Sequence, residues 1–452
     1  MATQSKQRVA VVGGGMLGMT LALRLRQQGR EVVLYERRDQ LGGLADSWQV
    51  GDVQWDRHYH VTLLSDSYLR GLLKELGIED RMRWVKTKTG FFTDGRLYSM
   101  SNSIEFLKFP PLGLIDKFRL AATITLTSRD KNWKKLESEL VFDYLTRLSG
   151  KRTANKIWLP LLKAKLGDNY RETSAAFIWA TIGRLYAARR SGLKEEMFGY
   201  MDGGYATTLR ALGDRLVGEG VDVRMSQSVE HVKPVDGGGV QITANAEHLV
   251  FDKCVMTIPS TVVPQLCPAL PDREKALHLG IKYQGIICAS VLLSRKLSGF
   301  YVTNITDEVP FTGVIEMSAL VPPAELGGKH LIYLPKYVLA DSEELAESDE
   351  QIEEKFMAGL RKLYPDLQDS EVLAFKVSRA KYVMPIPTIR YSASLPPRKS
   401  SLPGVYVANG AQLVNATLNV NEIVKLAESA AAEIAEDFEP LPKNDTQPVA
   451  VE

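Results

Sequence analysis

The stretch of sequence that decides the fold is RVAVVGGGMLGMTLALRLRQQGREVVLYERRDQLGG, residues 8–43. A valine-rich run, residues 9–12, stops at three consecutive glycines and is followed by apolar residues at helical spacing. A second β-branched run, residues 32–34, ends shortly before Glu36. This is the order of a strand, a tight turn, a helix and a parallel strand, so we predict an α/β fold that begins with a βαβ unit.

The glycines of the turn, Gly13, Gly15 and Gly18, have the G-x-G-x-x-G spacing of dinucleotide-binding proteins. Gly13 would allow the tight turn, and Gly18 would let the helix and strand pack closely. Gly15 would let a pyrophosphate reach the backbone N–H groups at the helix start, where Met16 and Leu17 lie. The spacing predicts a dinucleotide site, and a glycine-rich turn that serves packing alone is the alternative.

Glu36 closes the second strand, where a carboxylate can accept hydrogen bonds from the ribose hydroxyls of an adenosine. An acidic residue at this place favours NAD or FAD over NADP.

The composition is that of an ordinary globular protein: 452 residues, 45% hydrophobic and 24% charged, which is room for two or three domains. A net charge of +2 gives no reason to expect nucleic-acid binding. Cys254, Cys267 and Cys288 form no C-x-x-C pair, so we expect neither disulfides nor a metal site. The polar N-terminus leads directly into the first strand, and no apolar run approaches the ~20 residues of a membrane span, so we expect a cytoplasmic protein.

The segment from Arg37 to Gly43, RRDQLGG, resembles the second glycine pair of a flavoprotein superfamily. This superfamily contains amine oxidases, protoporphyrinogen oxidases, phytoene desaturases and UDP-galactopyranose mutases. The resemblance implies that the cofactor is FAD and that Gly42 and Gly43 leave room for its pyrophosphate and ribityl chain. Many relatives carry Arg directly after this pair, whereas this chain has Leu44.

Two later motifs resemble the same superfamily. FGYMDGGY, residues 198–205, resembles the glycine pair by which these chains return to the FAD domain, and Val229 would then present its backbone to the adenine. PGVYVANG, residues 403–410, resembles the last FAD motif, with A-N-G in place of the usual A-G-D. The resemblance therefore implies that Asn409 and Gly410 lie near the ribityl phosphate.

Asparagines crowd the start of the last predicted helix, residues 417–435. Asn419, together with Asn415 and Asn421, would cap this helix or contact the flavin pyrimidine. The resemblance as a whole implies a discontinuous Rossmann-like FAD-binding domain with an inserted α+β substrate-binding domain. The FAD-binding domain would comprise residues 1–65, 199–262 and 396–438, the substrate-binding domain residues 66–198 and 263–395, and residues 439–452 would be a disordered tail.

Two histidines, His58 and His60, stand where this superfamily returns to the flavin ring, and they are candidates for lining it. The alternative is that they are strand-end histidines with hydrogen-bonded side chains. Lys165 stands in an apolar setting before a helix-ending glycine. Buried there, it would have a lowered pKa and act on the substrate or hold a water; the alternative is a solvated or ion-paired lysine.

Arg184 shares one short helix with Tyr186, Arg189 and Arg190, a concentration that would suit an anionic group on the substrate or be simply exposed. Tyr382, with Arg379, leads into a proline-bearing turn like that of protoporphyrinogen-oxidase-like proteins. Both residues would face the cavity or be ordinary strand residues.

Residues 66–76 are expected to form a helix capped by Asp66. Further on, residues 106–135 join apolar and basic side chains. This mixture indicates a peripheral contact with a membrane or a lipophilic entrance, and an ordinary helix with one buried face has the same pattern.

The expected activity is FAD-dependent oxidation, in which hydride passes from an apolar or amphipathic small molecule to flavin N5. The alternative is an isomerase resembling UDP-galactopyranose mutase, without net redox change. In that case the Arg and Tyr residues between 184 and 205 would bind an anionic head group. The sequence leaves the oligomeric state open.

Overall fold

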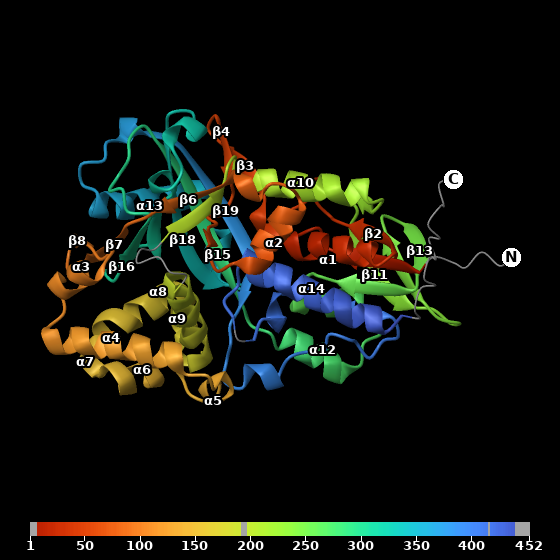
Figure 1. Ribbon diagram of the computed structural model, residues 1–452. Coiled ribbons are helices and arrows are strands. Elements are labelled where there is room, and N and C mark those ends of the chain that lie inside the picture. Colours follow the sequence, from red (N-terminus) through yellow and green to blue (C-terminus); the bar gives the residue numbers. More distant parts are fainter. Residues whose placement is uncertain (1–6, 191–196, 415, 439–452) are drawn as a thin grey trace, which may run out of the picture.

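The computed structural model describes residues 7–190, 197–414 and 416–438, with backbone alone for residues 103 and 185–190. Its strands form one parallel sheet, one larger mixed sheet and three small sheets (Figure 1). No helix within the described residues is long and apolar enough to cross a membrane.

The parallel sheet brings together strands from distant parts of the chain, in the order β10-β2-β1-β14-β20. Their bounds are β1 (Arg8–Val12), β2 (Glu31–Tyr35), β10 (Asp222–Arg224), β14 (Lys253–Met256) and β20 (Val405–Val407). All these strands are parallel, so their carboxyl ends lie at one edge of the sheet. The βαβ unit expected from residues 8–35 is present.

Each face of this sheet is covered. Val9 and Val11 of β1 pack in a core with the helices on one side, whereas Ala10 and Val12 pack against a three-stranded meander on the other. The helices are α1 (Met16–Gln27), α10 (Tyr205–Gly218) and α14 (Val420–Glu436), and the meander is β11 (Val229–Pro234), β12 (Val240–Ala244) and β13 (Glu247–Phe251). Burial on both faces explains why the strands are apolar without alternation.

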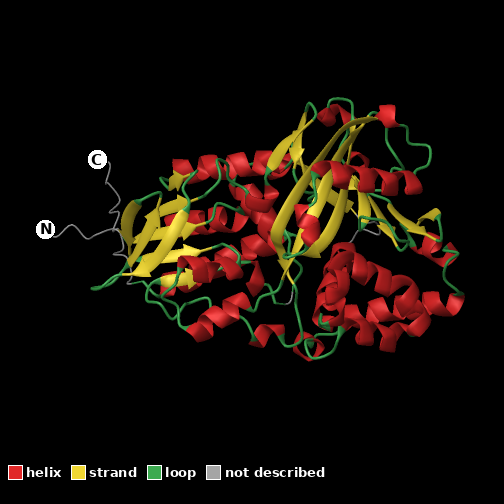
Figure 2. Cartoon of the chain, turned by 180° about the vertical axis from the view of Figure 1, so that it is seen from behind, coloured by secondary structure: helices red, strands yellow, loops and turns green. Residues whose placement is uncertain are grey.

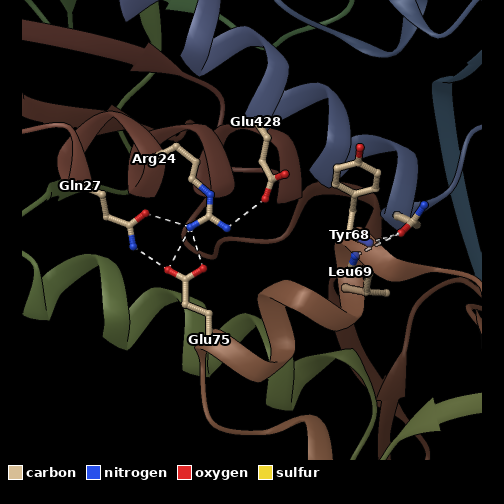
Figure 3. Close-up of polar contacts among 7 residues, drawn as sticks. Arg24, Gln27, Tyr68, Leu69, Glu75 and Glu428 are labelled. Carbon is tan, nitrogen blue, oxygen red and sulfur yellow. Dashed lines mark hydrogen bonds and ion pairs between the residues drawn. The ribbon is translucent and has the colours of Figure 1, made fainter.

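Helix α2 (Ser67–Glu75) is fastened to the helical face at both ends, as Figure 3 shows. At its C-terminal end, Glu75 accepts a hydrogen bond from Arg24 at 2.7 Å, and the same guanidinium reaches Glu428 of α14 at 3.1 Å. At its N-terminal end, the Asn421 side chain of α14 accepts from the N–H groups of Tyr68 and Leu69. Helix α2 is therefore attached to both the first and the last helix of the chain.

The expectation that Asp66 caps α2 is wrong. Its carboxylate makes no capping bond and instead accepts from the Leu63 N–H at 2.8 Å and pairs with Arg184. The cap comes from Asn421, which is 353 positions from Tyr68 in the sequence, too far for any local pattern to indicate.

The larger sheet has the order β19-β15-β18-β17-β16-β7-β8. Its strands are β7 (Thr89–Thr93), β8 (Arg96–Ser99), β15 (Tyr283–Leu293), β16 (Val302–Ile305), β17 (Gly313–Glu316), β18 (His330–Leu339) and β19 (Val372–Pro385). Helix α13 (Asp349–Leu363) packs its apolar side into one core of this sheet. Strands β3 (Ser47–Val50) and β4 (Val53–Asp56) form a hairpin, and β5 (Thr62–Leu63), β9 (Met197–Met201) and β6 (Met82–Lys86) form the remaining sheet.

A helical layer lies beside the larger sheet, as Figure 2 shows from behind. It comprises α3 (Ser103–Lys108), α4 (Leu114–Arg129), α5 (Trp133–Leu136), α6 (Val141–Ser149), α7 (Lys151–Thr153), α8 (Leu159–Leu166) and α9 (Ala175–Arg190). Two further short helices, α11 (Val263–Leu266) and α12 (Asp272–Leu279), follow β14.

Strand β13 is among the strands that the sequence pattern does not predict. The turn that precedes it is made by Asn245 and Ala246, both at positive φ. Such turns usually contain glycine, so this hairpin carries no recognisable turn signal. The domain boundaries drawn from the resemblance remain a prediction.

Candidate cofactor site and active site

Two glycines of the first turn are required by the fold itself. Gly13 has φ +110°, and its N–H donates to the Tyr35 carbonyl at 2.8 Å. A Cβ on Gly18 would lie 1.8 Å from the Gly13 carbonyl oxygen. The helix and strand therefore approach each other as the spacing predicts.

Gly15 differs from its neighbours because the protein gives no internal reason for a glycine. Its φ is −74°, and a Cβ there would meet one neighbouring atom, Gly43 Cα, at the ordinary contact distance of 3.8 Å. Gly15 is the N-cap of α1, and no described side chain caps this helix, which begins at Met16 and Leu17. Free N–H groups and the helix dipole make this end attractive to an anion, which is the chemistry that a pyrophosphate would need there.

The second glycine pair lies directly against the first turn. The Gly42 N–H donates to the Gly14 carbonyl at 2.8 Å, and Gly15 and Gly42 form a parallel bridge. Gly42 and Gly43 both have positive φ, and a Cβ on Gly43 would come within 3.1 Å of Gly15 Cα. The two turns thus form one continuous surface of backbone.

Glu36 is buried and holds this surface in place. One carboxylate oxygen accepts from the Gly14 N–H at 2.7 Å and the other from the Arg38 N–H at 2.9 Å. A carboxylate has about four acceptor positions, so two ribose hydroxyls can still bind. The backbone carbonyl of Glu36 accepts a hydrogen bond from the Gln227 N–H. The start of β11, at Val229, therefore lies close to the carboxyl end of β2. The Arg37 side chain is exposed.

The amide of Asn409 is engaged within the protein. It donates to the Ile258 carbonyl at 2.8 Å and to Ser260 Oγ at 3.2 Å, and it accepts from the Ala411 N–H at 3.0 Å. These bonds tie the chain after β20 to the chain after β14 and fix the position of Gly410.

Asn419 caps α14, as expected, by accepting from the Glu422 N–H at 3.1 Å. Asn421 caps α2 instead of its own helix. Asn415 lies outside the described residues.

His58 joins the second glycine turn to the larger sheet. Its Nδ1 is 3.3 Å from the carbonyl oxygen of Leu44, and its Nε2 is 2.8 Å from Ser378 Oγ on β19. Burial lowers its pKa to about 4, so the ring is neutral at pH 7. The tautomer that donates from Nδ1 and accepts at Nε2 satisfies both contacts. This geometry is that of a histidine with hydrogen-bonded side-chain nitrogens, one of the two interpretations of the sequence.

His60 contacts a residue that the sequence did not single out. Its ring centroid is 4.9 Å from that of Tyr205, the first residue of α10, and burial lowers the His60 pKa to about 4. The Tyr205 N–H donates to Asp56 Oδ1 at 2.8 Å. Burial raises the pKa of Asp56 to about 7, against the opposing effect of that N–H. The sequence feature that could have indicated Tyr205 is its position directly after the glycine pair Gly203-Gly204.

Lys165 reaches the histidine segment through two tyrosines. Its Nζ lies 3.7 Å from the centre of the Tyr337 ring, and the Tyr337 hydroxyl is 2.8 Å from that of Tyr59, between the two histidines. Burial raises the pKa of Tyr59 well above its usual value, so the phenol is neutral. The segment from His58 to His60 therefore belongs to an uncharged aromatic wall with one cation above it.

Arg184 lies in a cavity whose lining does not include the two histidines. Its guanidinium is 3.0 Å from Asp66 Oδ2, and both residues line this cavity of about 300 Å³ together with Trp179 and Asn419. The side chains of Tyr186, Arg189 and Arg190 lie outside the described residues.

Tyr205 is buried beside His60. Burial raises the pKa of its phenol, a hydrogen bond with Thr62 opposes the rise, and the carboxylates of Asp56 and Asp66 add to it.

Tyr382 and Arg379 both lie on β19 but contact different parts of the protein. Tyr382 is partly exposed and meets Tyr283 edge to face at 5.4 Å. Arg379 pairs with Asp349 of α13 at 2.5 Å and also donates to the Glu347 carbonyl at 2.6 Å. The guanidinium of Arg379 is therefore bound to the α13 side of the strand. Within the described residues, no group of three or more metal-ligating side chains lies together.

A parallel sheet with two abutting glycine turns, an acidic strand end and an uncapped first helix defines a dinucleotide-binding oxidoreductase of the Rossmann-like class. Residues 17–434 match the flavin-containing amine oxidoreductases, and the chain belongs to this family. Its cofactor is FAD, and it is an FAD-dependent oxidoreductase. The fold class predicted from the sequence is confirmed.

The chain is 23% identical over 386 residues to a 15-cis-phytoene desaturase of Glycine max, covering 79% of this chain and 66% of that protein. A solved structure named as a protoporphyrinogen oxidase, from Exiguobacterium sp. 255-15, superimposes with a TM-score of 0.76 at 17% identity, over 96% of this chain and 100% of the other. Putrescine oxidase bound to putrescine gives a TM-score of 0.74 at 16% identity, over 95% and 99%. At these identities the structural matches show the fold alone.

Proposed function

We propose that this protein uses FAD to dehydrogenate or desaturate an apolar or amphipathic small molecule. Two observations support this proposal: the sequence similarity to a 15-cis-phytoene desaturase, and the neutral aromatic wall around His58, Tyr59 and His60. An apolar substrate binds to such a wall without leaving buried charges unpaired. The wall is the observation on which the proposal depends most.

In the same proposal, FAD binds at the two glycine turns. Gly13, Gly15 and Gly18, with the first N–H groups of α1 at Met16 and Leu17, would bind the pyrophosphate, and Gly42 to Leu44 would border the ribityl chain. The remaining contacts would come from the acid and from the later motifs: Glu36, Arg37, Val229, Asn409, Gly410 and Asn419. Bound FAD supplies the redox chemistry by accepting hydride.

The residues around the aromatic wall would exclude water and orient the substrate. The rings of His60 and Tyr205 contact each other at a tilt of 51°, Tyr59 donates or accepts within the tyrosine pair, and Lys165 places one positive charge over Tyr337. Arg184 and Tyr382 would act at the edges of this region. Many flavin dehydrogenations need little beyond such positioning, since the cofactor carries the chemistry.

The test is anaerobic bleaching of the flavin absorbance on mixing with three substrate classes: a polyene in detergent, a porphyrinogen and a primary amine. We expect bleaching by an apolar substrate and little by the amine. Bleaching by amines alone would contradict the proposal.

A variant pair on α8 tests the role of the wall. Lys165→Met keeps the aliphatic stem and removes the charge above Tyr337, whereas Lys163→Met removes an exposed charge two residues earlier. We expect slower bleaching in the first variant and an unchanged rate in the second. Equal rates in both would remove Lys165 from the site.

The isomerase alternative is distinguished from the oxidoreductase by measuring how much electron acceptor is consumed for each product formed. An oxidoreductase consumes one two-electron acceptor for each product formed. Product that appears only after dithionite reduction, with no acceptor consumed, would favour the isomerase.

A further inference from the structure

Helix α4 has its polarity reversed. Four of its five buried residues, Asp116, Lys117, Thr123 and Thr127, are polar and the fifth is Leu120, whereas several of its exposed positions carry large apolar side chains. A helix that simply covers a core does the opposite. Leu120 and Ile124 pack into a core, but the large exposed apolar side chains of α4 are not explained by an ordinary helix with one buried apolar face.

The buried polar groups of α4 have partners, so the orientation of the helix is specified. The Lys117 ammonium donates to the Leu107 carbonyl of α3 at 2.7 Å. Asp116 accepts from Thr153 at 3.1 Å, and Thr127 shares a hydrogen bond of 2.9 Å with the Tyr144 hydroxyl. Turning α4 to hide its apolar side would leave these groups unsatisfied.

Helix α3, which Lys117 ties to α4, also carries exposed apolar side chains. We call the exposed apolar side chains of the two helices the α3–α4 patch. Its five side chains are between 60% and 78% exposed: Ile104, Leu107, Leu114, Ile115 and Phe118. Such a group of large exposed apolar side chains marks an interaction surface.

Basic side chains border this patch. Arg119 lies against Gly150, directly before Lys151, and Arg152 is within 3.4 Å of the buried Asp116 carboxylate while remaining largely exposed. Lys108 at the end of α3 is exposed as well. Of the nearby acids, Asp116 is buried and pairs with Arg152, and Glu105 accepts from Ser99 and Ser101 and keeps its charge. The basic side chains Lys108, Arg119, Lys151 and Arg152 therefore outnumber the two acidic ones beside the patch.

We infer that the α3–α4 patch docks the protein on an anionic phospholipid bilayer. Apolar side chains inserted into the headgroup region, with basic side chains beside them, are the pattern of interfacial helices. Neither helix is long enough to span a bilayer, so the contact is peripheral. Helix α9, which packs against α4, lines the 300 Å³ cavity, and patch and cavity therefore belong to one helical layer.

The experiment is flotation of the full-length, FAD-loaded protein with phosphatidylcholine vesicles, with or without phosphatidylglycerol, at low and high salt. We expect flotation with the anionic vesicles and its loss at high salt. Ile115→Glu with Phe118→Glu should abolish it, and Arg119→Glu should weaken binding roughly 10-fold. The matched control is Leu279→Glu, an exposed apolar residue of α12.

Flavin absorbance and circular dichroism report whether each variant is folded. Flotation that persists in the double variant, or that ignores lipid charge and salt, overturns the inference. The inference is also overturned if the protein elutes as a dimer that Phe118→Glu converts to a monomer without any flotation. In that case the patch covers a second copy of the chain.

Discussion

Replacing Gly15 by alanine, and then by valine, separates the needs of the fold from the needs of the cofactor. A Cβ at Gly15 meets Gly43 Cα at 3.8 Å and nothing closer, and its φ of −74° is open to any residue. The apoprotein should therefore fold, with a change in stability below about 1 kcal/mol from the altered N-cap. On the proposed assignment of this turn, however, the added methyl group would occupy the space through which the pyrophosphate approaches the N-terminus of α1.

The expected loss of affinity follows from the hydrogen bonds at stake. A hydrogen bond to a charged group contributes about 1.5–3 kcal/mol. If the methyl group displaces the phosphate from two backbone N–H donors, the loss is about 3–6 kcal/mol, or roughly 10²- to 10⁴-fold in Kd. Valine, with two further methyl groups, should abolish FAD retention.

The assay is titration of FAD into each apoprotein, followed by quenching of flavin fluorescence, with urea unfolding of the same samples. Gly71→Ala is the matched control, because Gly71 lies in α2 and a Cβ there meets nothing within 4 Å. Gly18→Ala should fail at folding, since its Cβ would lie 1.8 Å from the Gly13 carbonyl oxygen. Wild-type FAD affinity in folded Gly15→Val would refute the assignment of the first turn.

Three further predictions concern buried polar groups. The pKa of Asp56 is raised to about 7, so the native state loses up to about 4 kcal/mol of stability as pH rises from about 4 to 7. Asp56→Asn should remove this pH dependence of the free energy of unfolding, measured by urea titration, while keeping an acceptor for the Tyr205 N–H. His58, whose pKa is lowered to about 4, acts in the opposite sense: its stabilisation is complete above about pH 6.5 and is lost as pH falls to about 4. His58→Gln should therefore reduce the acid dependence of stability by about one proton, and an unchanged slope would contradict burial of the ring. Asn421→Ala removes the cap of α2 and should cost about 1–2 kcal/mol in urea unfolding, with faster hydrogen exchange at the Tyr68 amide as the local sign.

The first βαβ unit could be predicted because its information is local. Valines in one short run, glycines at fixed spacing and an acid at the next strand end each restrict the backbone of their own neighbourhood.

The aromatic wall could not be predicted, because its contacts join distant positions. Tyr59 and Tyr337 are 278 residues apart, and Asp56 and Tyr205 are 149 apart. No local pattern marks a tyrosine that will share a hydrogen bond with another, or an aspartate that will cap a helix later in the chain. The histidines drew attention by residue type, whereas the residues that set their environment had no such mark.

The attachment of α2 to both ends of the chain determines when the molecule can be completed during synthesis. Arg24 leaves the ribosome early, yet its full set of partners includes Glu428. The core around α1 likewise contains apolar residues of α14, such as Val424 and Ala427. Until those residues emerge, the first helix has an exposed apolar side and α2 lacks its cap. The first glycine turn is therefore among the first segments made and among the last to gain its final surroundings, and chains truncated before α14 should depend on chaperones.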